Sequence, residues 1–237
     1  EQTAQDEGHQ LALAGRQGME PLPLEVRAHA VVEALLFVRR REVLGDRDAA
    51  RVAYVFGDLP AEGPLIVEGA ISVYGAAQGQ PASVSVAERL STLFRQRRPH
   101  DYVAVLSFLP RTEPLDQLLQ ELRNRIGERL SCATMLGIGP RYLHSTGQLY
   151  KGGPDDGVFL LLTGDDPVDL PIPGASWTFS ILKQAQALGD LQALQQRGRR
   201  LLRLHLRGPL DGAVPQLRQV VDDALAAALA KGAGARL

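Results

Sequence analysis

The sequence concentrates hydrogen-bonding capacity in one short stretch, GPRYLHSTGQLYKGG at residues 139–153. His144 can shuttle a proton near neutral pH, so it is the candidate acid–base catalyst. The polar side chains around it have the chemistry to bind a phosphate and sugar hydroxyls. These candidate ligand-binding residues are Arg141, Ser145, Thr146, Gln148 and Lys151. Composition alone equally fits a polar turn, in which a histidine is more often structural or solvated.

The stretch follows an apolar run, residues 131–139, that predicts a β-strand. Two glycines and Pro140 predict a tight exit from this strand, and a helix could begin near Arg141. Unpaired N–H groups at such a helix start favour an anion, and we expect Lys151 to add a movable point charge. The GIGP sequence is a weak phosphate signal, far short of a P-loop.

Strands and helices alternate regularly in the C-terminal part of the chain. Apolar runs predict strands at 102–109, 131–139, 157–164 and 199–208. Predicted helices run from a cap at Ser83 or Ser85 to Arg97, over 113–130, over 176–198 with a break near Gly189, and over 213–232. This alternation predicts an α/β fold, a three-layer αβα sandwich around a mostly parallel sheet. Ligands of such sheets bind beyond the carboxyl ends of the strands, where residues 139–153 fall.

The N-terminal part is less regular. We expect a flexible segment at 1–22 and a mixed part at 23–80, with a helix over 24–44, a strand at 51–56 and a strand ending at Gly75. The α/β domain then covers 81–237. The polar first residues do not resemble a signal peptide, and the missing initiator Met predicts that the sequence begins inside a longer chain.

Composition is that of a soluble globular protein, with 45% apolar and 22% charged residues among 237. The net charge of -1 argues against nucleic acid or an anionic membrane as partner, and no apolar run is long enough to span a bilayer. Cys132 is the single cysteine, which excludes an internal disulfide and fits a reducing cytoplasm. We expect Cys132 to be a buried, inert thiol.

Several other conspicuous residues are expected to have structural roles. These are His29 on a helix, His100 in a loop, His205 in the core or at a sheet edge, Asp155-Asp156 and Asp165-Asp166 in solvated turns, and Trp177 and Phe179 as core anchors. No spacing of potential ligands predicts a metal site, and the patterns G-x-S-x-G and G-x-G-x-x-G do not occur. We therefore expect no metal and no cofactor.

The stretch ATMLGIGPRYLHSTGQLYKGGPDDGVFLLLT, followed by DLPIPGASWTFSILKQAQALGDLQALQQRGRRLLRLHL, resembles the C-terminal segment of bacterial phosphoglucose isomerases fused to transaldolase. That family reads close to G-P-R-[YF]-L-H-S-T-G-Q-L-H-K-G-G, then D-x-x-I-P-G, then a G-R-R strand ending in H-L. HDYVAVLSFLP is similar to the family's D-Y-V-A-L-L-A-Y-L-P strand. The resemblance covers roughly residues 64–208 and is strongest over 133–208.

The resemblance implies a sugar-isomerase (SIS) type of αβα fold and a sugar phosphate as ligand. His144 looks like the histidine that assists ring opening, and Gln148 matches a nearby glutamine. Ser145 and Thr146 would border the sugar, while the family's second histidine is Tyr150 here. Isomerisation through an enediol also needs a carboxylate base. The family's E-S-x-G-K and D-Q-P-x-V-E stretches are absent, so we expect the base to come from another domain or another subunit.

We predict part of a glucose-6-phosphate isomerase, which interconverts glucose 6-phosphate and fructose 6-phosphate, within a transaldolase/phosphoglucose isomerase polypeptide. Its partners would be the sugar phosphate and a transaldolase or first isomerase domain, in the same or another chain. One alternative is a non-catalytic sugar-phosphate-binding module, since nothing marks Glu33 or Glu68 as a base. Another is a purely structural or oligomerisation domain, in which the alanine-rich helix DDALAAALAKG could pack against a partner such as a second copy, although we expect this helix mainly to cover the sheet.

Overall fold

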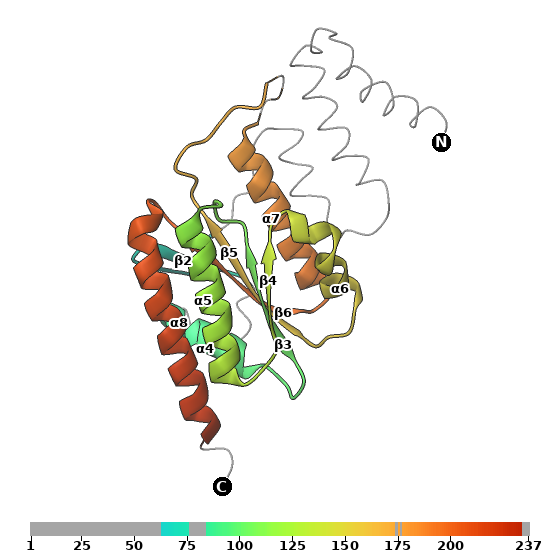
Figure 1. The fold of residues 1–237 in the computed structure, drawn as a ribbon, viewed down its shortest axis with the longest axis vertical. Coiled ribbons are helices and arrows are strands. Elements are labelled where there is room, and N and C mark those ends of the chain that lie inside the picture. The colour runs from blue at the N-terminus through green and yellow to red at the C-terminus, as the bar shows by residue number, and fades with distance from the viewer. Residues whose placement is uncertain (1–62, 76–83, 174, 176, 234–237) are drawn as a thin grey trace, which may run out of the picture.

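The computed structural model describes residues 63–75, 84–173, 175 and 177–233. The predictions for segment 1–22, helix 24–44 and strand 51–56 fall outside these residues, as do those for His29 and Glu33. The described part is built on one six-stranded sheet with helices on both faces, which confirms the predicted α/β three-layer sandwich (Figure 1).

The sheet has the strand order β1-β2-β6-β5-β3-β4. Its strands are β1 (Ile66–Glu68), β2 (Ile71–Tyr74), β3 (Tyr102–Ser107), β4 (Thr134–Ile138), β5 (Gly157–Gly164) and β6 (Arg200–Leu206). The last four in this order, β6, β5, β3 and β4, are parallel, whereas β1 and β2 form an antiparallel hairpin beside β6. The single strand predicted before Gly75 is therefore a hairpin, which turns at Gly69 with a φ of 56°. Glycine adopts this left-handed conformation without the steric cost that a Cβ brings.

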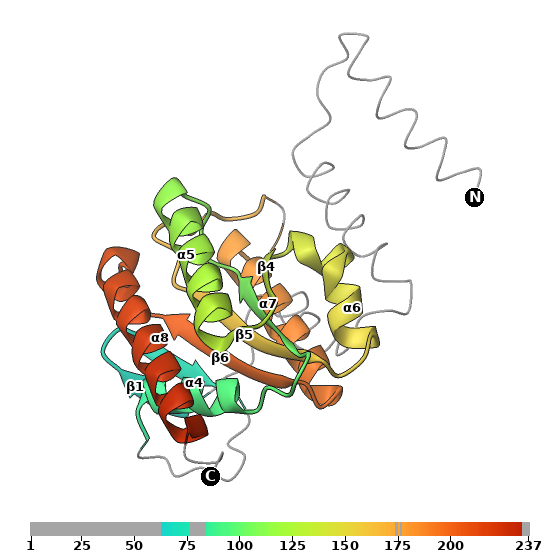
Figure 2. The same cartoon turned by 60° about the horizontal axis from the view of Figure 1, so that its bottom comes forward.

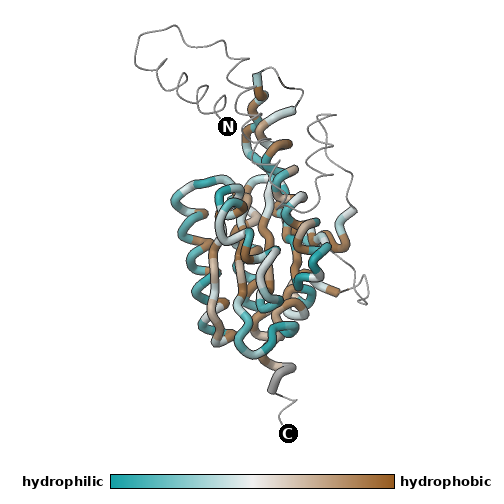
Figure 3. Tube along the Cα trace, turned by 90° about the vertical axis from the view of Figure 1, so that its right-hand side faces the viewer, coloured by the Kyte–Doolittle hydropathy of each residue, from teal (hydrophilic) through white to brown (hydrophobic). Residues whose placement is uncertain are grey.

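Helices cover the two faces in separate layers (Figures 1 and 2). One face carries α4 (Val86–Arg95), α5 (Glu113–Leu130) and α8 (Leu210–Ala233), whose apolar residues share a core with the sheet. The other face carries the short 3-10 helix η1 (Arg141–His144), α6 (Thr146–Gly152) and α7 (Phe179–Gln196). Apolar stretches lie along the strands and polar ones along the outer helix surfaces, as Figure 3 shows.

The bounds of α5 and β5 are those predicted from the sequence, because both carry strong local signals. Pro114 lies in the first turn of α5, and Ser131 ends that helix with a φ of 49°. All eight residues of β5 are buried, as expected for a central parallel strand covered on both faces. Ser85 caps α4 by accepting a hydrogen bond from the Glu88 amide.

Two predictions for α7 are wrong. The helix runs without a break past Gly189, because Leu188 and Leu191 pack into the core beside it. That packing outweighs the cost of an internal glycine, which is about 1 kcal/mol. Phe179 is not a core anchor, since 54% of it is exposed at the first turn of the helix. Trp177 is half-buried.

Candidate functional site

The carboxyl ends of the parallel strands form one edge of the sheet, where the loops that follow β3, β4, β5 and β6 lie. The helix after β3 is on one face and the helix after β5 is on the other, although these two strands are neighbours. This is the topological switch point at which open α/β sheets bind ligands. Residues 139–153 follow β4, which lies next to β3. The start of the predicted segment, with η1 (Arg141–His144), thus lies at the expected edge, whereas α6 leads back across the sheet until Gly153 meets Arg199, just before β6.

Residues 139–153 fold into η1 and α6, and the segment divides into a buried and an exposed side. The residues on the buried side are Tyr142, Leu143, Gly147, Tyr150 and Lys151. On the outer side, Arg141, His144 and Ser145 are exposed, and Thr146 and Gln148 are half-buried. The polar residues predicted for ligand binding therefore lie mostly on one accessible surface, and Lys151 is the exception.

The glycines of this region make room for aromatic rings. A Cβ on Gly139 would lie 2.6 Å from ring carbons of Phe108, and one on Gly137 would lie 3.0 Å from the ring of Tyr142. A Cβ on Gly147 would lie 2.8 Å from the Tyr142 carbonyl oxygen. Because real Cβ atoms do not approach other atoms this closely, larger residues here would force the backbone apart. Close packing accounts for the glycines of GIGP without a phosphate.

A helix begins at Arg141 as expected, but it is the short 3-10 helix η1 and not an α-helix. The chain forms a 3-10 turn first, in which the amide of Leu143 donates to the Pro140 carbonyl oxygen at 3.0 Å. The amide of Ser145 likewise donates to Tyr142 at 3.1 Å. A tight 3-10 turn uses these donors internally, so they do not form an anion site.

Lys151 is not the movable point charge that the sequence predicted. Its ammonium group forms an ion pair with the Asp190 carboxylate on α7, and these side chains are 6% and 1% exposed. The other carboxylate oxygen of Asp190 accepts a hydrogen bond from the Tyr142 hydroxyl at 2.5 Å. Burial and the adjacent Asp190 raise the pKa of Tyr142 well above its ordinary value, so this hydroxyl remains a donor. A buried charge needs such partners, and this requirement holds Lys151 inside.

Gln148 keeps one unused hydrogen-bonding atom. Its side-chain nitrogen donates to the Leu143 carbonyl oxygen at 2.8 Å, but its buried Oε1 has no partner among the described residues. Buried polar atoms normally have a hydrogen-bond partner, so this unpaired oxygen is an exception and needs a donor. By contrast, Tyr150 is 2% exposed and packs against Tyr102 and Phe159. Tyr150 is a core residue.

Within the described residues, the His144 side chain has no hydrogen bond or ion pair, and neither has that of Arg141. Both lie exposed on or beside the turn that follows β4. With no partner in the part of the chain that the structure describes, this imidazole and this guanidinium are available to a ligand. Together with Ser145, they form the accessible centre of the candidate site.

The carboxylates that follow β5 are already engaged. Asp165 accepts from the ring of His205 at 3.0 Å and from the Gly208 amide at 2.7 Å. Asp166 pairs with Lys183, and Asp169 accepts from the Ser180 amide. These contacts link the loop after β5 to neighbouring elements, so the predicted solvated turn at Asp165-Asp166 is only partly solvated.

His205 belongs to the sheet and not to the His144 site. Its Nδ1 lies 3.0 Å from the Thr163 hydroxyl, and 15% of its side chain is exposed. Burial lowers its pKa, although Asp165 opposes this effect. Because β6 and β4 are separated by β5 and β3, their ends lie about 14 Å apart. His205 therefore has the structural role expected of it, but it lies on an interior strand of the sheet and is only partly buried, so it is neither at a sheet edge nor fully in the core.

Glu68 also has a structural partner. Its carboxylate accepts a hydrogen bond from the Val86 amide at 3.0 Å, at the first residue of α4. A negative charge there stabilises the helix through its unpaired N–H groups and its dipole. The structure therefore offers no reason to treat Glu68 as a base.

A hollow of about 650 Å³ lies between the first half of α5 and β4, the last strand of the described sheet. It is lined by Leu136, Ile138 and polar side chains that include one arginine and three carboxylates, namely Arg111, Glu113, Asp116 and Glu121. Arg111 is already paired with Asp116. This acidic lining disfavours a phosphate, so the hollow does not extend the candidate site.

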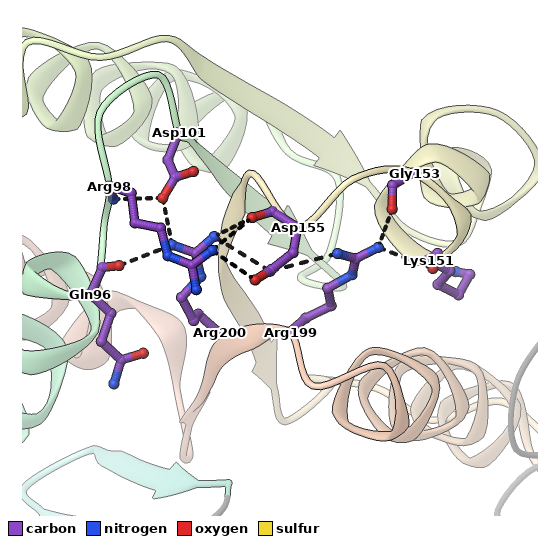
Figure 4. A network of polar contacts seen from close by, with 8 residues as sticks. All are labelled: Gln96, Arg98, Asp101, Lys151, Gly153, Asp155, Arg199 and Arg200. Carbon is purple, nitrogen blue, oxygen red and sulfur yellow. Dashed lines mark hydrogen bonds and ion pairs between the residues drawn. The ribbon is translucent and has the colours of Figure 1, made fainter.

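At the amino ends of the parallel strands, opposite the turn that carries His144, arginines and aspartates form a network (Figure 4). Arg200 pairs with Asp101 at 2.5 Å and reaches Asp155, which also accepts from Arg98 at 3.1 Å. Burial raises the pKa of Asp101, but hydrogen bonds from Arg200 and the Arg98 amide outweigh it and leave the pKa below its ordinary value. The network joins the amino ends of β3, β5 and β6, and Asp155 is part of it.

Within residues 63–75, 84–173, 175 and 177–233, no group of three His, Cys, Asp or Glu side chains is placed to hold a metal ion. No helix in these ranges has the length and apolar character needed to cross a membrane.

No protein-family model matches the chain, and no curated protein matches it. Among solved structures, the chain is similar to a hypothetical protein from Thermus thermophilus, with a TM-score of 0.55 and 21% sequence identity. The similarity covers 63% of this chain and 40% of the Thermus chain, so this protein spans well under half of its neighbour's length. At this identity the likeness shows the fold alone.

Proposed function

We propose that this chain supplies the histidine half of a sugar-phosphate isomerase site that interconverts glucose 6-phosphate and fructose 6-phosphate. The observation that carries the proposal is the division of residues 139–153, which buries the anchoring residues and leaves Arg141, His144 and Ser145 exposed at the ligand-binding edge of the sheet. We infer the reaction itself from the sequence resemblance to transaldolase/phosphoglucose isomerases.

The accessible groups suit separate roles in ring opening. His144 would move the proton between the ring oxygen and the anomeric hydroxyl of the sugar. Arg141 would bind the phosphate through charge-assisted hydrogen bonds. Ser145 and Thr146 would bind sugar hydroxyls, and Gln148 would join them once a small shift exposes its buried, unpaired Oε1. Lys151 has no place among these contacts, because its charge is buried against Asp190.

The base that moves the proton between C1 and C2 would come from a transaldolase or isomerase domain of the same polypeptide, or from another subunit. In the described part of the chain, the carboxylates after β5 are held by His205, Lys183 and the Ser180 amide. We place the reaction in the cytoplasm, to which the single free thiol of Cys132 is suited.

The test is the isomerase rate of the full-length protein with His144→Ala. We expect kcat/KM to fall by about 10²- to 10⁴-fold, the usual contribution of a general acid or base. The matched control is His100→Asn, since His100 is also exposed but lies at the amino end of β3. Asparagine tolerates the φ of 71° at that position. A near-normal rate for His144→Ala would refute the catalytic role.

The engagement of the nearby carboxylates favours a second candidate, a binding module without catalysis. Calorimetric titration with fructose 6-phosphate and with a non-reactive sugar-acid phosphate separates the two. Binding that weakens in His144→Ala, with no turnover by the full-length protein, would support the binding module.

A further inference from the structure

One carboxylate holds both ends of the segment that carries His144. Asp190 pairs with Lys151 through one oxygen and accepts the Tyr142 hydroxyl through the other. Tyr142 lies two residues before His144, and Lys151 lies seven residues after it. The exposed turn between them is therefore fixed to α7 at two points.

A second tie fixes the far end of α6. The Arg199 guanidinium donates to the carbonyl oxygens of Lys151 at 3.2 Å and Gly153 at 2.6 Å, as Figure 4 shows. The side chain of Arg199 is 6% exposed. These carbonyls belong to the last turn of α6 and the residue after it, where backbone acceptors lack partners within the helix. Asp190 and Arg199 thus connect residues 139–153 with α7 and with the residue just before β6.

We infer that Tyr142, Lys151 and Asp190 form a clamp that positions His144 for catalysis, with Asp190 as its central positioning residue. This inference rests on the proposed function. A buried ion pair is a poor source of stability, because the loss of hydration offsets the attraction, and apolar residues of equal size often do as well. Charge-assisted hydrogen bonds are, however, directional, so they fix the turn in one arrangement. Catalytic groups need such support to within about 0.5 Å.

The sharpest test is Tyr142→Phe, which removes one hydroxyl and keeps the ring and the Lys151–Asp190 pair. The matched control is Tyr102→Phe, because Tyr102 packs against the same aromatic cluster but lies on β3. In the full-length protein we expect Tyr142→Phe to lower the isomerase kcat by about 10- to 100-fold with little change in KM. Tyr102→Phe should stay within about twofold of wild type, since it leaves the clamp intact.

A double-mutant cycle shows whether Tyr142 acts through His144. On a His144→Ala background, Tyr142→Phe should cause no further loss of kcat, because the group it positions is gone. Equal losses on both backgrounds, or equal losses for Tyr142→Phe and Tyr102→Phe, would overturn the inference.

Amide hydrogen exchange gives a readout that does not depend on activity. Tyr142→Phe should raise exchange at residues 141–148 at least about tenfold more than in β3, and Tyr102→Phe should not. Unchanged exchange at 141–148 would overturn the clamp. Loosened exchange together with a harmless His144→Ala would refute the proposed function and leave the clamp as a structural feature.

Discussion

Gly147→Ala tests the close packing of α6 against η1, which sets the position of the exposed turn. The added Cβ would lie 2.8 Å from the Tyr142 carbonyl oxygen and 3.3 Å from its ring. Even weak C–H···O contacts keep carbon and oxygen about 3.3 Å or more apart, so α6 must move by roughly 0.5 Å. Tyr142 cannot yield easily, because its hydroxyl is held by Asp190.

The magnitude follows from two opposing terms. Overpacking of this kind costs about 1–3 kcal/mol, and the better helix propensity of alanine returns up to about 1 kcal/mol. We therefore expect Gly147→Ala to lower the free energy of unfolding by about 1–2 kcal/mol. For a chain of this size, that corresponds to a fall in Tm of about 2–8 °C.

Gly152→Ala is the matched control, because Gly152 is in the same helix but a Cβ there would meet nothing within 4 Å. It should leave stability unchanged or raise it by up to about 1 kcal/mol. Urea denaturation with a shared m-value measures both variants. If Gly147→Ala proves as stable as Gly152→Ala, the packing argument for this glycine is wrong.

Three further measurements test the electrostatics. Burial lowers the pKa of His205 from 6.5, so the free energy of unfolding should fall as the pH drops below 6.5 towards the folded pKa. His205→Gln should flatten this pH dependence, and an unchanged dependence in the variant would contradict the burial argument. The pKa of Asp101 is held below 3.8, so the ionised Asp101 should stabilise the folded state above pH 3.8 and lose this effect in more acidic solution. In thermal melts, Asp101→Asn should therefore lose less stability in acid than the wild type does. Burial raises the pKa of the half-buried Cys132 thiol above 9.0, so it should react with a disulfide reagent at pH 8 more slowly than in the unfolded chain, and equal rates would count against burial.

Local sequence patterns are sufficient to predict those helices and strands whose hydrophobic pattern is unambiguous. The helix at Glu113–Leu130 repeats leucine on one face, and the strand at Gly157–Gly164 has a continuous apolar run from Val158 to Leu162, so the sequence predicts both with their observed bounds. The alternation of such elements was enough for the αβα architecture. It also located the start of residues 139–153 at the carboxyl ends of the strands, because the position of those ends follows from strand direction alone.

Long-range packing decided which polar residues of the segment are accessible. Lys151 and His144 look alike in the sequence as polar residues of one turn, yet Lys151 is buried because Asp190, which is 39 residues away, provides its counter-charge. The unbroken course of α7 past Gly189 likewise depends on the sheet beneath it. Local sequence determines the period of an element and the chemistry of its side chains, whereas burial depends on partners that only the folded chain brings together.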